Sequence, residues 1–321
     1  MVSHFSQAKM KNIGWWYFEV PVPEDWDIAA QGKTRDVEVF RLADSYAVRM
    51  EVTLEKMPFE KAKTADQLYD AFKKNWERRL AEIRRKEGIE AELKHISKEY
   101  VNVKGHRGIC WVFRVSNATM IAAVWYCEKS ERAITLSYTT RSPDDERIFH
   151  SMLKGVKCHY DTASERALWS TLLFDIRIAQ KYQLAAAKFT ATSSFCLFVE
   201  PDSLEYLVVG YSGLASILFN KYRKGLREWF EKEILKDIQK NSQIKLPKIK
   251  YEEISATELT FNGETFSLSK TKKKIILGKI WLDKEMDRII VTGVYFSATK
   301  RKESEELLNE IVDQLHLTRK I

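Results

Sequence analysis

The sequence is poor in the residues from which common catalytic and metal sites are built: its 321 residues include 4 cysteines, 6 histidines and 12 glycines. The cysteines, at positions 110, 127, 158 and 196, form no Cys-x-x-Cys pair and have no regular spacing, which gives no support for a disulfide framework or a zinc motif. A glycine-rich phosphate loop, a His-Glu-x-x-His motif and a Gly-x-Ser-x-Gly motif are all absent. We therefore expect no catalytic motif, no bound metal and no cofactor, and these absences favour a protein that is not an enzyme.

Long apolar segments are absent too. The longest uncharged stretch, Tyr206–Asn220, has fifteen residues, fewer than the roughly 18–20 that a membrane span requires. Met1–Asn12 is polar and basic and lacks the apolar core of a signal peptide. We expect no membrane association and a cytoplasmic location. Asparagine and glutamine are scarce while charged residues are abundant, a balance typical of proteins from hot environments.

The composition is that of a folded globular protein, with 45% hydrophobic, 31% charged and 12% aromatic residues. A chain of this length comfortably forms two domains. The net charge of +8 is spread evenly over the two halves of the chain. It permits binding to a polyanion, but it is not concentrated in a nucleic-acid-binding arm.

An internal repeat is visible at an offset of 156 residues. The offset aligns residues at the start, in the middle and at the end of each half: Phe18 with Phe174, Trp125 with Trp281, Arg132 with Arg288, and Val156 with Val312. Matches in the same order at one offset predict a tandem duplication. We place the first module at residues 1–160, a short linker at 161–167 and the second module at 168–321.

Apolar alternation and turn residues predict the elements of the first module. Thr64 as the N-cap, Gln67 in a capping box and Gly88 as the stop signal delimit a helix. A second helix begins near Ser142. The predicted strands are Trp16–Val22, confined to an edge by its prolines, Asp36–Leu42, Tyr46–Leu54, Leu93–Val103, Ile109–Val115, Met120–Cys127 and Ala133–Thr139.

The second module is predicted to repeat this order, with a long helix over Ile217–Gln239 and a last helix over Lys302–Leu315. Its predicted strands are Leu172–Ile178, Cys196–Val199, Tyr206–Val209, Glu252–Phe261, Thr265–Ser269, Ile275–Leu282 and Arg288–Phe296. The central strands are apolar at nearly every position, which indicates cover on both faces. The predicted fold class is therefore α+β, with two tandem copies of a mostly antiparallel sheet covered by helices.

The first half resembles a known family in a series of short segments. These are Pro21–Trp26 (Pro-Val-Pro-Glu-Asp-Trp), Val103–Gly108 (Val-Lys-Gly-His-Arg-Gly), Ala122–Tyr126 (Ala-Ala-Val-Trp-Tyr), the turn Glu131-Arg132 and Val156–Cys158. Their order resembles the Mog1/PsbP-like α/β/α sandwich fold, which includes bacterial lipoproteins and extrinsic photosystem subunits. The second half fits through strand order only. Because members of this family mostly act as binding or assembly factors, the resemblance implies a non-enzymatic role.

Histidine and cysteine come closest together in sequence at His150, Cys158 and His159. A metal site or a Cys–His nucleophile there is the minor alternative, and a helix end followed by a linker is the interpretation that we favour. His106 lies in the turn Lys104–Gly108. We interpret that turn as a solvated hairpin tip, although its two glycines would also let a phosphate approach the backbone.

Cys110 and Cys127 fall on two consecutive predicted strands. If Ala118-Thr119 is the hairpin loop between them, the two cysteines lie directly opposite each other. Two buried free thiols are the favoured interpretation, and a disulfide between Cys110 and Cys127 is the alternative.

Two clusters of basic residues could contact a polyanion. They are Lys270, Lys272, Lys273 and Lys274 at a predicted hairpin tip, and Arg78, Arg79 and Arg85 on the first helix. Such clusters can neutralise phosphates, but acidic residues alternate with the basic residues along the helix, which favours a solvated surface.

Together these features favour a non-catalytic binding or assembly factor that acts on a protein partner or by self-association. One alternative is a nucleic-acid-associated protein that uses the basic hairpin and helix. The other is an enzyme or small-ligand binder with its site between the modules, because catalytic residues need not form a local motif.

Overall fold

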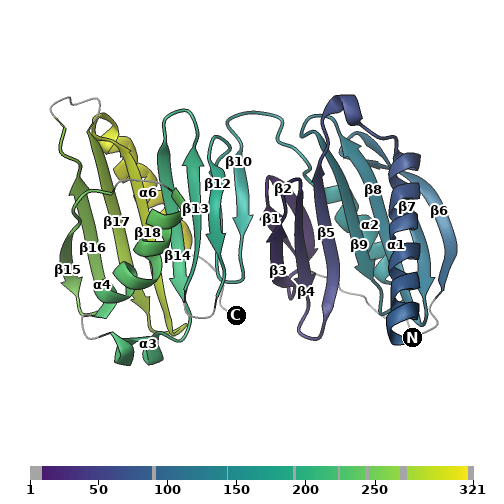
Figure 1. Ribbon diagram of the computed structural model, residues 1–321, viewed down its shortest axis with the longest axis horizontal. Helices are drawn as coiled ribbons and strands as arrows, with labels where there is room; N and C mark the ends of the chain where they lie inside the picture. Colours follow the sequence, from purple (N-terminus) through teal and green to yellow (C-terminus); the bar gives the residue numbers. More distant parts are fainter. Residues whose placement is uncertain are drawn as a thin grey trace. The chain divides into compact units, whose positions relative to one another are not determined.

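The computed structural model describes residues 9–88, 92–142, 144–190, 193–222, 225–242, 246–267 and 273–316 (Figure 1). The chain forms two compact units, Met1–Leu172 and Leu173–Ile321. The predicted linker, residues 161–167, falls within the first unit. Among the described residues, no helix is both long enough and apolar enough to cross a membrane.

The first unit contains a seven-stranded antiparallel sheet with the strand order β3-β4-β5-β9-β8-β7-β6. A separate hairpin, β1–β2, precedes this sheet, and β10 lies against β1 near the end of the unit. The strands are β1 Met10–Trp15, β2 Phe18–Pro23, β3 Asp27–Lys33, β4 Val37–Ala43, β5 Val48–Lys56, β6 Leu93–Val103, β7 His106–Val115, β8 Ala118–Cys127, β9 Arg132–Thr139 and β10 Arg166–Ser170.

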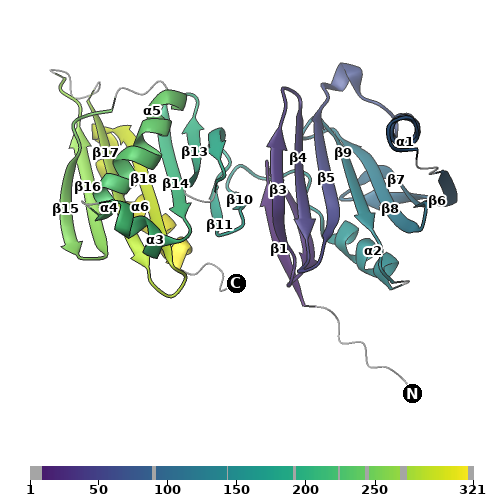
Figure 2. The same cartoon turned by 60° about the horizontal axis from the view of Figure 1, so that its bottom comes forward.

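Two helices cover opposite faces of this sheet (Figure 2). The helix α1 (Ala65–Glu87), preceded by a 3-10 turn at Phe59–Lys61, packs on the face that includes Ile109, Trp111 and Phe113 of β7. The helix α2 (Asp145–Gly155) covers the other face. Because side chains alternate along a strand, the even-numbered residues of β7 point towards the α2 face.

The ends of α1 confirm the signals in the sequence. Thr64 Oγ1 accepts a hydrogen bond from the Gln67 N–H at 3.3 Å, and Gln67 Oε1 accepts one from the Thr64 N–H at 2.9 Å. Gly88 ends the helix in the left-handed region, with a φ of 69°, which glycine adopts without a steric penalty.

The second unit contains a sheet with the order β12-β13-β14-β18-β17-β16-β15. Four short helical segments cover one face, and α6 covers the other (Figures 1 and 2). The strands are β11 Asp175–Ala179, β12 Gln183–Lys188, β13 Ser194–Glu200, β14 Glu205–Ser212, β15 Lys250–Ser255, β16 Glu258–Glu264, β17 Lys274–Asp283 and β18 Arg288–Ser297. The helices are α3 Ala215–Lys221, α4 Gly225–Trp229, a π-helical turn Phe230–Leu235, α5 Lys236–Ser242, a 3-10 turn Ala298–Lys300 and α6 Arg301–His316.

The two sheets have the same topology, and this confirms the predicted α+β fold class and the duplication. In each, three consecutive strands are followed by a helical crossover to the far edge, and four strands then return to the third. The registers agree at the predicted offset: Trp125 pairs with Ile134, and Trp281 pairs with Ile290.

Several predicted elements were wrong in detail. The single strand over Trp16–Val22 is a hairpin, in which Trp16 and Tyr17 form the turn with φ values of 52° and 60°. β3 was missed because only Ile28 of its seven residues is buried, and Ala, Gln and Gly are weak strand formers.

In the second unit, the predicted helix Ile217–Gln239 is divided into segments, the first of which ends at Tyr222 in an extended conformation. The predicted strand Glu252–Phe261 is a hairpin of β15 and β16. Of the predicted strand at 265–269, residues 265–267 lie in no strand, and 268–269 lie outside the described residues.

Candidate metal centre

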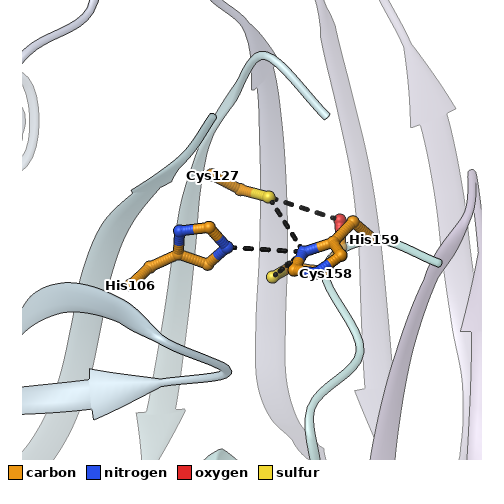
Figure 3. A group of neighbouring side chains, drawn as sticks. All are labelled: His106, Cys127, Cys158 and His159. Carbon is orange, nitrogen blue, oxygen red and sulfur yellow. Dashed lines mark hydrogen bonds between the residues drawn. The ribbon is translucent and has the colours of Figure 1, made fainter. Parts of the chain in front are cut away.

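Two histidines and two cysteines converge at one end of the first unit's sheet (Figure 3). His106, Cys127, Cys158 and His159 each offer one ligand atom, and these four atoms all lie within 4.8 Å of one another. Cys127, Cys158 and His159 are buried, whereas His106 is partly exposed. The four residues come from three segments that are far apart in the sequence.

The β7–β8 hairpin positions the first pair. His106 is the first residue of β7, and Cys127 is the last residue of β8. The ladder between these strands runs from Val115–Ala118 to Gly108–Trp125. If the same register is continued by two residues on each strand, His106 lies opposite Cys127.

The chain after α2 positions the second pair. It leaves the helix after Gly155, where an added Cβ would lie 2.6 Å from Pro21 Cγ. Lys157 then exchanges two backbone hydrogen bonds of 2.9 Å with Glu19 of β2. This bridge holds the chain against the hairpin β1–β2, and the next two residues, Cys158 and His159, reach the end of β8.

The Nδ1 atom of His159 lies at the centre of the group. It is 3.3 Å from His106 Nε2, 3.4 Å from Cys127 Sγ and 3.4 Å from Cys158 Sγ. A tetrahedral zinc ion, with bonds of about 2.0 Å to nitrogen and about 2.3 Å to sulfur, separates two nitrogens by about 3.3 Å and a nitrogen from a sulfur by about 3.5 Å. The three distances from His159 Nδ1 therefore match three of the six edges of such a tetrahedron, and the other three separations are within 4.8 Å.

A carboxylate supports His159 from the side away from the sulfurs. His159 Nε2 lies 3.2 Å from Asp161 Oδ1, and Asp161 also accepts hydrogen bonds from Lys104 at 2.9 Å and Lys129 at 2.8 Å. The hydrogen bonds from Lys129 and Lys104 hold the pKa of Asp161 well below its usual range. A carboxylate that accepts the second ring N–H of a histidine fixes the tautomer in which the other nitrogen can bind a metal.

The two thiols are electrostatically coupled. A hydrogen bond from the Cys158 thiol lowers the pKa of Cys127, and the same contact raises the pKa of Cys158. Ser130 lowers the pKa of Cys127 further, and the Trp125 side chain opposes the rise for Cys158. The Ser130 hydroxyl and the Trp125 indole nitrogen thus lie beside the two sulfurs, where both are placed to donate to a metal-bound thiolate.

The second unit lacks this set of residues although it has the same topology. At the offset of 156 residues, Cys127 corresponds to Asp283, and Cys158 and His159 correspond to Gln314 and Leu315. The structural setting also differs, because α6 continues to residue 316 whereas α2 ends before the pair. The fold therefore forms without these ligands, which supports a function specific to the first unit.

A cavity of about 920 Å³ opens beside the centre, and His106 and His159 form part of its wall. Its other lining residues include Lys63, Arg107 and Asp66. The imidazoles therefore face a space that solvent can enter, while the sulfurs lie behind them.

The sequence placed His159 and Cys158 with His150, but the structure separates them. His150 Nε2 lies 3.4 Å from Glu99 Oε1, and these two residues form a different group with Cys110. His106, predicted to be a solvated hairpin tip, is instead part of the candidate centre. The signal that the sequence offered was the adjacent pair Cys158-His159.

The predicted cross-strand pair of Cys110 and Cys127 was wrong. The turn lies at residues 116–117, not at 118–119, so that Cys110 pairs with Ala123. All four cysteines are free thiols. Burial raises the pKa of Cys110 to about 12, as is usual for a thiol that packs in a core.

The structure divides the basic residues between the two units. In the first, Arg78 donates to Asn75 Oδ1 at 2.9 Å, Arg79 lies 5.9 Å from the Trp76 ring centroid, and Arg85 is exposed near the end of α1. In the second, Lys273 pairs with Glu264, and Lys274 donates to the Ser203 carbonyl oxygen at 3.2 Å. Lys270 and Lys272 lie outside the described residues. A polyanion contact through these residues stays a prediction.

No protein-family model matches the chain, and no curated protein matches it. Among solved structures, cyanobacterial PsbP (CyanoP) from Synechocystis sp. PCC 6803 is 14% identical, with a TM-score of 0.34, over 49% of this chain and 96% of CyanoP. The Ran-binding protein Mog1p of Saccharomyces cerevisiae is 11% identical, with a TM-score of 0.28, over 44% of this chain and 88% of Mog1p. A protein of unknown function from Pseudomonas aeruginosa is 13% identical, with a TM-score of 0.24, over 48% of this chain and 99% of that protein. The resemblance to Mog1/PsbP-like proteins is a resemblance of fold.

Proposed function

We propose that the first unit binds one divalent ion of the zinc class through His106, Cys127, Cys158 and His159. The observation that supports this proposal is the convergence of two sulfurs and two imidazole nitrogens within 4.8 Å. Two thiolates and two imidazoles are a donor set of structural zinc sites. Soft sulfur ligands also disfavour magnesium and calcium, which prefer oxygen.

The ion would serve binding or assembly and not catalysis. Four protein ligands fill a tetrahedral coordination sphere, whereas catalytic zinc keeps one position for water or substrate. The ion would join the tip of β7, the end of β8 and the chain after α2, and so fix one end of the sheet. A zinc-dependent hydrolytic activity would contradict this role.

The test is metal analysis of the full chain, purified under reducing conditions and then substituted with cobalt. We expect one zinc or cobalt per chain, and a cobalt spectrum with the sulfur charge-transfer and d–d bands of a tetrahedral S₂N₂ site. Cys127→Ser and His159→Ala should each lose the ion or change the spectrum, while circular dichroism confirms that the sheets remain folded.

The matched control is Cys196→Ser, because Cys196 is equally buried but lies in the second unit. This variant should bind one ion with an unchanged spectrum. A cobalt spectrum without sulfur charge transfer, or an unchanged spectrum in Cys127→Ser, would sink the proposal.

A further inference from the structure

On the premise that the first unit binds zinc as proposed above, we propose that the ion is held under redox control: Cys127 and Cys158 join in a disulfide under mild oxidation and release it. The geometry that supports this is the placement of both sulfurs on one side of His159 Nδ1, at 3.4 Å each. The two sulfurs lie within 4.8 Å of each other. Closing this gap to the disulfide length of about 2.05 Å requires movement of two short side chains.

The surrounding backbone allows that movement on one side only. Cys127 ends β8, where the ladder with β9 pairs it with Arg132. Cys158 lies between α2 and β10, in a stretch that belongs to neither a helix nor a sheet ladder. Because Lys157 beside it is bonded to Glu19, Cys158 approaches Cys127 by rotation of its side chain and a local shift at residue 158, while the strand stays in place.

The other two cysteines cannot compete for this pairing. Cys110 pairs with Ala123 and lies four residues along β7 from His106, a distance of about 13 Å on a strand. Cys196 belongs to the second unit. Oxidation within the first unit should therefore give a single product, the disulfide between Cys127 and Cys158.

A small oxidant would approach the sulfurs from the cavity, past the His106 imidazole. His106 is partly exposed and lines the cavity of about 920 Å³. It follows Lys104 and Gly105, whose φ values of 51° and 88° form a tight turn. Displacement of this one imidazole would open the metal–thiolate centre to hydrogen peroxide without disturbing the sheet.

The chemistry is a two-electron oxidation of the thiolates by hydrogen peroxide. The Cys127 thiolate attacks one peroxide oxygen, the O–O bond breaks, and the products are a sulfenic acid and one hydroxide ion. The Cys158 thiolate then attacks the Cys127 sulfur and expels a second hydroxide as the S–S bond forms. Two thiolate ligands are lost in this step, and zinc leaves because only His106 and His159 remain. Thiol reductants reverse the reaction and restore the site.

The experiment treats zinc-loaded full-length protein with one equivalent of hydrogen peroxide. A chromogenic zinc chelator follows metal release, and alkylation with peptide mass mapping locates the disulfide. We expect one zinc released for every two thiols lost, a linkage of Cys127 to Cys158, and recovery of binding after dithiothreitol and zinc. Cys110→Ser and Cys196→Ser should behave as the wild type does.

His106→Ala separates zinc binding from disulfide formation, because it removes one metal ligand and keeps both thiols. We expect weaker zinc binding and faster formation of the same disulfide in this variant. If the reduced wild type binds no zinc, the proposed function fails. If it binds zinc but keeps it after oxidation, or loses it without a Cys127–Cys158 linkage, only the redox control is overturned.

Discussion

At the scale of single residues, Asp161 connects the candidate metal centre to the charged wall of the cavity. Its carboxylate lies 3.2 Å from His159 Nε2 and accepts hydrogen bonds from Lys104 and Lys129. These lysines favour the ionised carboxylate, which in turn favours the His159 tautomer that presents Nδ1 to the sulfurs. Two surface lysines thus contribute to the orientation of a buried ligand.

Asp161→Asn should weaken zinc binding about 10–100-fold, the usual effect of removing a carboxylate that orients a metal-bound histidine. The measurement is a competition titration against a chromogenic chelator. The control is Asp66→Asn, because Asp66 also lines the cavity and binds a lysine, Lys98 at 3.0 Å, but contacts no member of the centre. Equal affinities for both variants would show that Asp161 has no orienting role.

Asp145 is a buried carboxylate that should contribute to the acid stability of the first unit. Its Oδ2 accepts hydrogen bonds from Arg49 Nη2 at 2.9 Å and from the Arg141 N–H at 2.6 Å. Burial alone would raise the pKa of Asp145, but the backbone hydrogen bonds from Arg141 and Ser142, together with Arg49, lower it. The folded pKa is therefore below the unfolded value of about 3.9, so the stabilisation is complete above about pH 5 and is lost as the pH falls through the folded pKa.

Asp145→Asn should cost about 2 kcal/mol of unfolding free energy at pH 7, the range for a hydrogen bond to a charged group. Asp44 still lies 3.4 Å from Arg49 Nε and limits the loss. Urea unfolding between about pH 3 and pH 7 should show the gap between wild type and variant shrinking towards acid. A gap that stayed constant would mean that the Asp145 charge contributes nothing.

The candidate centre was missed in the sequence because of a register error. A turn at residues 118–119 pairs Cys110 with Cys127, whereas the observed turn at 116–117 pairs Cys110 with Ala123. The observed register, continued, brings His106 to Cys127. The remaining ligands, Cys158 and His159, approach through the bridge between Lys157 and Glu19, a tertiary contact that local sequence patterns do not encode.

At the scale of elements, the predictions were confirmed where a residue determines the local backbone by itself, as a helix cap does. The capping box of Thr64 and Gln67 and the stop at Gly88 gave both ends of α1. The predictions were wrong where tertiary packing determines the backbone conformation. Trp16 and Tyr17 read as part of a strand, but they form the turn of a hairpin, and Trp16 is buried with its ring centroid 5.7 Å from that of Trp169. Packing there stabilises a positive φ that aromatic residues disfavour.

In the second unit, residue 278 of β17 must be glycine because the Phe261 ring packs directly against its backbone. An added Cβ would lie 2.0 Å from Phe261 Cζ, and the Phe261 ring stacks on Phe230 at 4.7 Å in the core. Gly278→Ala should therefore destabilise the second unit by about 1–3 kcal/mol, as overpacking of a core does. Gly32→Ala is the control, because an added Cβ there has no neighbour within 4 Å. Equal unfolding midpoints in denaturant would contradict the argument.

At the scale of the whole molecule, the duplication gives two units with one topology and different sites. Both sheets repeat the same strand order, and each unit has its own buried core. The four ligands of the candidate centre occur in the first unit only. The second unit can therefore serve as an internal control. A property that depends on the fold should appear in both units, whereas a property that depends on the candidate metal centre should appear in the first unit alone.

Zinc should therefore stabilise the two units unequally. A ligand that binds only the folded state adds RT ln(1 + [L]/Kd), which is about 2.7 kcal/mol at a free concentration of about 100 times Kd. Differential scanning calorimetry of the reduced chain should resolve two transitions, and a strong zinc chelator should lower only the transition of the first unit. Gly278→Ala identifies the transition of the second unit, because it should lower the temperature of that transition with or without zinc. Cys127→Ser should abolish the effect of the chelator on the first unit. If the chelator instead lowered both transitions equally, zinc would be acting outside the centre formed by His106, Cys127, Cys158 and His159.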